Sequence, residues 1–141
     1  VRDPIDFASV DVSFISLRLI LPVLFCLLQE GGEAVCLIKP QFEAGREKVG
    51  KKGVVRDPAT HRQVIETVCS FALETGFSIL GLTFSPVKGP EGNIEYLLYL
   101  KKSAPPQGLD AIEMEEVVTL AHSSLDDSGR AIRSEGGEGN I

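Results

Sequence analysis

Three ionisable residues that are far apart in the sequence have side chains that can move a proton if the fold brings them together. They are Asp11, Lys39 and Glu95. A lysine flanked by two carboxylates can be tuned as a proton acceptor, or can hold a hydroxyl group in place. Singly, each has an ordinary explanation: Asp11 as a cap or turn residue, Lys39 as a solvated strand end, Glu95 as an exposed strand start. The prediction of a catalytic site therefore depends on their convergence.

Two expected strands carry Asp11 and Lys39 to the same edge of a sheet. Phe7–Val12 is expected to form a short buried strand, with Asp11 near its C-terminal end. Glu33–Lys39 is an apolar run without polar alternation, which is typical of a parallel strand covered on both faces. The carboxyl ends of parallel strands share one edge, and open α/β sheets bind their ligands there.

The apolar segment Leu17–Gln29 is expected to be the helix that connects these strands, covered on most of its sides. Ser13–Ser16 precedes it as a loop that can cap its first turn. Pro22 lies inside the segment, so the helix either starts near Pro22 or kinks there. The glycine pair at 31–32 is expected to end it.

A second helix follows the loop after Lys39. Asp57 is expected as its N-cap, Pro58 as its first residue and Gly76 as its C-terminal stop. Its apolar residues recur at helical spacing, and they are Val64, Ile65, Val68, Phe71 and Ala72.

Two further strands are expected to pair in antiparallel fashion. Phe77–Phe84 and Ile94–Lys101 are joined by a glycine- and proline-rich loop that leaves no room for a helix. Because the second of these strands runs against its neighbours, its start faces the edge that carries Asp11 and Lys39. Glu95 lies at that start, so all three ionisable residues are predicted at one edge.

The segment Lys39–Arg62 is a basic island in an acidic protein. It carries seven Lys or Arg against three Asp or Glu, a net charge of +4, whereas the rest of the chain carries seven against seventeen, or −10. A basic loop at the end of a strand predicts a site for an anionic partner. The cations expected to contact that partner are Arg46, Lys48, Lys51, Lys52 and Arg56.

Cysteines and histidines favour structural roles. Cys26, Cys36 and Cys69 lie in apolar surroundings without metal-ligand spacing, which predicts buried thiols in a reducing compartment and no metal site. His61 and His122 are expected to be plain helix residues.

Common catalytic motifs are absent. The string GPEGN at 89–93 has glycines but lacks the lysine and serine of a phosphate loop, and Ser13 and Ser16 lack the context of a nucleophile elbow. Phe42 and Tyr96 can stack on a base, but buried packing is the favoured role for both.

The chain is expected to hold one main domain, at residues 1–102, followed by a linker and C-terminal helix at 103–125 and a disordered tail at 126–141. The helix should bury a stripe made of Ile112, Val117, Leu120 and Ala121. The longest apolar run, Leu19–Leu28, is shorter than the about 20 residues that a membrane span needs. With no signal peptide in view, a cytoplasmic protein without stable membrane insertion is expected.

Three strings closely resemble the TlyA family, whose members are described as hemolysin A and as FtsJ-like ribosomal RNA methyltransferases. The strings are DVSFISL (Asp11–Leu17), LIKPQFEAGREKVGKKGVVRDPATH (Leu37–His61) and SPVKGPEGNIEYLLYL (Ser85–Leu100). The resemblance covers roughly residues 7–102. It implies an α/β fold, the Rossmann-like sheet of S-adenosylmethionine-dependent methyltransferases, here partial, with parallel strands ending in an antiparallel pair and helices on both faces.

The resemblance also implies methylation of ribose 2′-hydroxyls in ribosomal RNA by a Lys-Asp-Lys-Glu set. Asp11, Lys39 and Glu95 match three of its members, and Asp11 would also lie at the cofactor. The first lysine of the set, the glycine-rich turn that holds S-adenosylmethionine and the N-terminal RNA-binding domain of the family have no counterpart in this sequence. The chain therefore resembles the C-terminal half of the methyltransferase domain.

Two alternatives remain open from the sequence. One is a non-catalytic module that binds RNA or a protein partner, since the cofactor half is absent. The other, implied by the hemolysin name, is a membrane-active protein, against which the short apolar run argues. An open sheet edge further predicts possible self-association.

Overall fold

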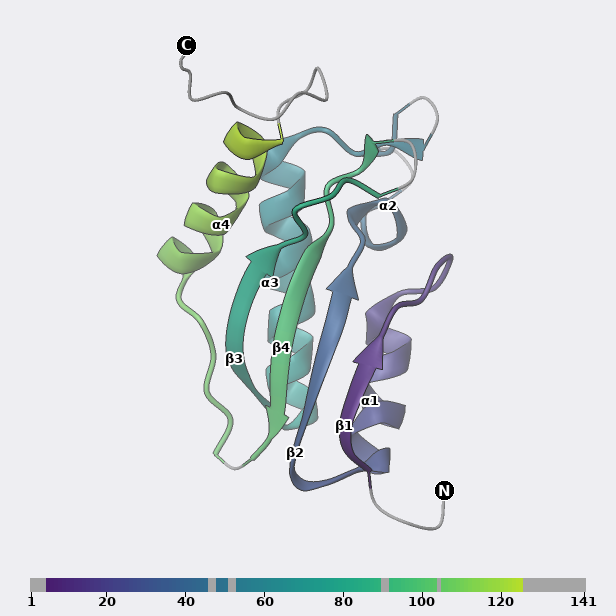
Figure 1. Cartoon of the computed structure of the whole chain (residues 1–141), viewed down its shortest axis with the longest axis vertical. Helices are drawn as coiled ribbons and strands as arrows, with labels where there is room; N and C mark the ends of the chain where they lie inside the picture. Colours follow the sequence, from purple (N-terminus) through teal and green to yellow (C-terminus); the bar gives the residue numbers. More distant parts are fainter. Residues whose placement is uncertain (1–4, 46–47, 51–52, 90–91, 104, 126–141) are drawn as a thin grey trace.

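The computed structural model describes residues 5–45, 48–50, 53–89, 92–103 and 105–125 (Figure 1). Four strands and four helices follow in the order β1 (Ile5–Val10), α1 (Leu17–Leu27), β2 (Leu28–Ile38), α2 (Pro40–Glu43), α3 (Pro58–Thr75), β3 (Phe77–Phe84), β4 (Tyr96–Lys102) and α4 (Ala111–Ser124). The expected tail at 126–141 lies outside the described residues.

The strands form one mixed sheet in the order β1-β2-β4-β3. β1 and β2 are parallel, whereas β4 is antiparallel to both β2 and β3. The predicted antiparallel pair is therefore confirmed. As a result, the ends of β1, β2 and β3 and the start of β4 all lie at one edge, which we call the site edge.

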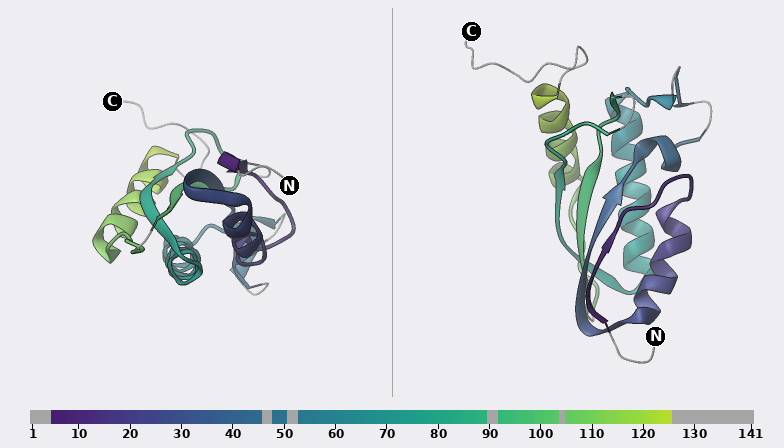
Figure 2. Two further views of the ribbon diagram at one scale, coloured as in Figure 1. Left: turned by 90° about the horizontal axis from the view of Figure 1, so that it is seen from below. Right: turned by 45° about the vertical axis from the view of Figure 1, so that its right-hand side comes forward.

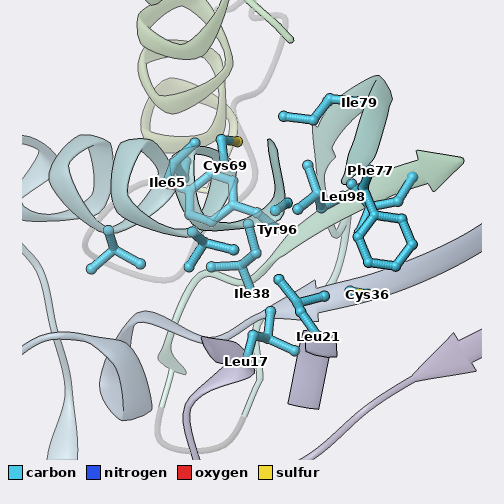
Figure 3. Close-up of a cluster of buried hydrophobic side chains, with 14 of the residues drawn as sticks. Leu17, Leu21, Cys36, Ile38, Ile65, Cys69, Phe77, Ile79, Tyr96 and Leu98 are labelled. Carbon is cyan, nitrogen blue, oxygen red and sulfur yellow. The ribbon is translucent and has the colours of Figure 1, made fainter. Parts of the chain in front are cut away.

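Helices α1 and α3 lie side by side against the sheet, and α4 packs against α3 and along β3 (Figure 2). The described residues thus supply two helices on one face and a third at the β3 side. Apolar side chains from these helices meet β2, β3 and β4 in the core, where Tyr96 lies within the cluster (Figure 3). Leu21, Ile38, Ile65, Phe77 and Leu98 are among the fully buried members.

The predicted boundaries of α3 are confirmed. Asp57 caps it by accepting from the N–H of Ala59, Pro58 opens it, and Gly76 ends it with a φ of 123°, which favours glycine. Ser16 likewise caps α1 as expected, because its side chain accepts from the N–H of Arg18.

Helix α1 and the strands around it differ from the prediction in exposure. α1 begins at Leu17 and continues through Pro22, so the later start is wrong. It is covered on one side, because Leu19 is 66% and Val23 58% exposed. β1 is an edge strand rather than a buried one, with Phe7 54% exposed.

Strand β2 starts earlier than expected, and its faces are covered unequally. It begins at Leu28, so the glycine pair at 31–32 lies within the strand and does not end the helix. Ala34, Cys36 and Ile38 are fully buried, whereas Val35 and Leu37 on the other face are half-buried. Only the face toward α1 and α3 is thus closed within the described residues.

Two smaller expectations were wrong for a similar reason. α4 buries Met114, Val118 and Ala121, and leaves Ile112 and Leu120 of the expected stripe more than half exposed. Cys36 and Cys69 are buried, and burial raises the pKa of each thiol to about 12, but Cys26 is exposed on the open side of α1. In α4 the neighbouring elements cover a different side from the one that the apolar pattern favoured, and in α1 they cover fewer sides than expected.

Candidate active site

The amine of Lys39 lies at the site edge in an ion pair with the carboxylate of Asp11. It also donates to Oγ of Ser13 at 3.1 Å. Lys39 is the residue after β2 and is 9% exposed, whereas the side chain of Asp11, after β1, is 63% exposed. The predicted convergence of these two residues is confirmed, and the pair combines a buried amine with a carboxylate that faces outward.

Glu95 lies at the same edge, because Ile38 pairs with Tyr96 in the antiparallel register of β2 and β4. Lys39 and Glu95 are the next residue beyond that pair on each strand. Glu95 is 7% exposed, so it is not the exposed strand-start residue of the ordinary explanation. Within the described residues, no ion pair joins it to Lys39.

The carboxylate of Glu95 occupies a cradle built by Gly89 and Gln41. A Cβ added to Gly89 would lie 2.6 Å from Cδ of Glu95, which real contacts do not tolerate. Nε2 of Gln41 donates to Oε2 of Glu95 at 3.4 Å, and the buried Oε1 of Gln41 has no hydrogen-bond partner in the described part of the chain. The first glycine of GPEGN thus allows close approach of a carboxylate, a role that no motif indicated.

A second carboxylate ties the two halves of the site edge together. Glu43, at the end of α2, accepts from Oγ of Ser16 and from the N–H of Leu17, both at 2.7 Å. Burial raises the pKa of Glu43, while these hydrogen bonds and nearby Arg18 lower it in part. Together with the Lys39 ion pair, Glu43 fixes the loop after β1 to the segment after β2.

Phe14 is another residue at this edge that sequence reasoning missed. It has a positive φ of 67°, which is strained for a bulky side chain, and it is 88% exposed. Its ring lies 4.8 Å from that of Phe42, centroid to centroid. An exposed aromatic ring held in a strained loop beside Asp11 and Ser13 is suited to contact a flat ligand.

Only some of the cations that were predicted to bind an anion lie among the described residues. Lys48 and Arg56 are exposed, while Arg46, Lys51 and Lys52 lie outside the described residues. Lys48 and Arg18 line a cavity of about 270 Å³ between α1, α2 and α3. Glu43, Gln63 and Thr67 also contribute to its wall, so the cavity is polar.

His61 is not a plain helix residue. Its ring is 0% exposed, with Nδ1 2.8 Å from the Tyr96 hydroxyl and Nε2 2.8 Å from the carbonyl of Val55. Burial, with the neighbouring ring of His122, lowers the pKa of His61 to about 4. The imidazole is therefore neutral at physiological pH. His122 approaches this ring with a centroid distance of 4.7 Å.

The FtsJ-like methyltransferase family profile matches residues 1–102. The chain belongs to this family. It is 52% identical over 125 residues to YqxC of Bacillus subtilis, which is provisionally named an rRNA methyltransferase. It is 39% identical over 119 residues to TlyA of Mycobacterium tuberculosis, named a 16S/23S rRNA (cytidine-2′-O)-methyltransferase.

These matches cover 85% and 84% of this chain but only 44% of each relative, so the chain spans less than half the length of the relatives it matches. A solved structure from Streptococcus thermophilus, provisionally described as a hemolysin, superposes with a TM-score of 0.80 at 54% identity. The superposition covers 83% of this chain and 42% of that one. The predicted fold and family are confirmed.

A further relative, 44% identical over 89 residues, carries the name hemolysin A in Brachyspira hyodysenteriae. Among the helices that the structure describes, none is long and apolar enough to cross a membrane.

Proposed function

We propose that this chain supplies the catalytic edge of an S-adenosylmethionine-dependent methyltransferase that modifies ribose 2′-hydroxyls in ribosomal RNA. The observation that carries the proposal is the buried Lys39 amine, which is paired with Asp11 and lies on the strand next to that of Glu95, at the same edge of the sheet. Relatives that match most of this chain are named as rRNA methyltransferases, which supports the substrate class. Because the chain spans 44% of those relatives, the proposal concerns the complete enzyme.

The residues at the edge suit the handling of a hydroxyl proton. Lys39 in its charged form donates to the 2′-oxygen and holds it; in its neutral form it accepts the 2′-hydroxyl proton. Asp11 orients the amine, and Glu95, fixed in its cradle, is placed to orient it or the hydroxyl from the other side. As the 2′-oxygen takes the methyl group that the cofactor would supply, its proton would pass to the Lys39 amine or to water.

S-adenosylmethionine, when bound, supplies a methyl group on a positively charged sulfur. Asp11 fits that charge, because its carboxylate is outward-facing at the end of β1. The Oε1 atom of Gln41, which has no hydrogen-bond partner among the residues that the structure describes, fits a donor of cofactor or substrate. The cavity that Arg18, Lys48 and Glu43 line carries more positive than negative side chains, so we assign it to the RNA side rather than to the sulfonium.

The remaining features fit an RNA strand. Lys48, Arg18 and Arg56 would contact phosphates, and such contacts weaken as salt rises because bound counterions are released. The exposed ring of Phe14, backed by Phe42, would stack on a base next to the reacting ribose.

The test is methylation of ribosomal RNA by the complete enzyme and its Lys39→Ala variant. The enzyme should make products in which the adjoining phosphodiester resists alkali, as 2′-O-methylation requires, and the variant should lose activity by about 10²-fold or more while keeping its fold by circular dichroism. Methyl groups on bases, or full turnover by Lys39→Ala, would refute the proposal. RNA binding without methylation by the complete enzyme would favour the non-catalytic module instead.

A further inference from the structure

Two buried polar side chains fix the segment Gly53–Arg56 to the chain around Glu95. Asn93 is 2% exposed; its Nδ2 donates to the carbonyl of Gly53 at 2.9 Å, and its Oδ1 accepts from the N–H of Val55 at 3.0 Å. His61 contacts the carbonyl of the same Val55 at 2.8 Å. Both polar groups of Val55 are therefore held by side chains.

The second nitrogen of His61 extends this link to β4. A carbonyl can only accept, so the proton of the neutral ring is on Nε2, and Nδ1 must accept from the hydroxyl of Tyr96 at 2.8 Å. Tyr96 is fully buried and immediately follows Glu95. In the sequence, Glu95 thus lies between Asn93, which bonds Val55 directly, and Tyr96, which bonds it through His61.

Arg56, exposed and directly after Val55, is a predicted phosphate contact. We infer that Asn93 and His61 are positioning residues that keep Arg56 and Glu95 in one fixed geometry, so that RNA backbone bound at Arg56 also aligns the carboxylate of the site. This inference rests on the proposed function. It goes beyond it by assigning two residues that touch neither RNA nor the reacting atoms.

The physical reason is the precision that chemistry at this edge needs. Loops that carry binding residues are usually the mobile part of a fold, and a misplacement of about 1 Å at a reacting centre can lower the rate by about 10²-fold. Neutral hydrogen bonds from buried side chains remove that freedom without adding charge beside Glu95. Their loss should therefore impair turnover more than RNA affinity.

The first experiment separates these two effects in the complete enzyme. Asn93→Ala and His61→Ala should lower kcat by about tenfold or more and change the Kd for a ribosomal RNA fragment by less than about twofold. His61→Gln keeps one donor and one acceptor and should recover most of kcat. A rise in Kd with unchanged kcat, or no change in either, would overturn the inference.

Ser78→Ala is the matched control. Ser78 is also buried, at 5% exposure, and its hydroxyl ties Ser103, Pro105 and Gln107 to β3, but at the opposite edge of the sheet. This variant should lower Tm and leave kcat unchanged. If Ser78→Ala lowers kcat as much as Asn93→Ala does, general loss of rigidity explains both, and Asn93 has no special role.

A second measurement does not require turnover. On addition of the RNA fragment to ¹⁵N-labelled enzyme, the amide signals of Arg56 and Glu95 should shift together, and Asn93→Ala should leave only the Arg56 shift. Coupled shifts without methylation would refute the proposed function, and of this inference only the coupling between Arg56 and Glu95 would stand. If the Arg56 signal shifts without the Glu95 signal in the enzyme without substitutions, or if no RNA binds at all, the inference is overturned.

Discussion

Lys102 and Lys39, at opposite edges of the sheet, show that a partly buried amine can have a structural or a chemical role. Lys102, at the end of β4, donates to the carbonyls of Phe25 at 2.7 Å and Leu28 at 2.8 Å, and lies 4.4 Å from the centroid of the Phe25 ring. Lys39, at the site edge, is bonded to the side chains of Asp11 and Ser13. The first amine closes the end of α1, and the second faces exchangeable partners.

The difference separates structural from chemical use of the same group. Backbone carbonyls at a helix end are fixed and do not take up protons, so the two hydrogen bonds of Lys102 stabilise the fold. A ribose hydroxyl can replace the Asp11 carboxylate or the Ser13 hydroxyl as the hydrogen-bond partner of the Lys39 amine.

The largest predicted effect is a pH dependence of the free energy of unfolding that arises at His61. The pKa of His61 is lowered from 6.5 to about 4 by burial and by His122. Between these values the unfolded chain binds the extra proton, so the stability that His61 contributes is fully present above pH 6.5 and is lost as pH falls toward 4. Over the whole window this is on the order of 3 kcal/mol.

Urea unfolding at pH 7.5 and pH 5 measures this effect. His61→Gln, which does not titrate, should lose less stability than the unaltered protein between the two pH values. If both proteins lose the same free energy of unfolding between the two pH values, His61 is not a buried neutral ring. The contrast between the site edge and the opposite edge of the sheet would then be weaker.

The next effect concerns the cradle of Glu95. Gly89→Ala should displace the carboxylate, because the added Cβ has no room, and should lower methylation by the complete enzyme by about 10²-fold. Gly81→Ala in β3 is the matched control, since nothing lies within 4 Å of its added Cβ. Equal activity of the two variants would remove Glu95 from the mechanism or show that it can shift freely.

The smallest effect is expected from Lys102→Met. The variant loses two charge-assisted hydrogen bonds and the ring contact, and its free energy of unfolding should fall by about 2 kcal/mol. Methylation should be unchanged at a temperature where the protein stays folded. Loss of turnover in a folded Lys102→Met protein would break the distinction between the two lysines.

Much of the architecture follows from local sequence patterns. Asp57, Pro58 and Gly76 mark the ends of α3, because capping and positive φ depend on residues close in sequence. The runs that form β2, β3 and β4 follow from apolar content. The placement of Asp11 and Lys39 at one edge follows from strand direction alone, and the ion pair agrees with it.

Other features follow from helical spacing only in part. His61 lies three and four residues before Val64 and Ile65, on the buried face of α3, so the period of the helix already indicated burial. The period did not indicate that Val55 and Tyr96 would be its partners. Likewise, the apolar pattern of α4 did not show that Met114 and Val118, rather than Ile112 and Leu120, would be covered.

The sequence by itself determined the four strands, the three longer helices, their order, the family and the edge at which three ionisable residues gather. Only the tertiary structure decided which groups are in contact. It paired Lys39 with Asp11, placed Glu95 in the Gly89 cradle and joined Glu43 to the start of α1. The physical reason is range. Caps, turns and apolar periods act over a few residues, whereas each of these contacts depends on packing between segments that the sequence alone does not align.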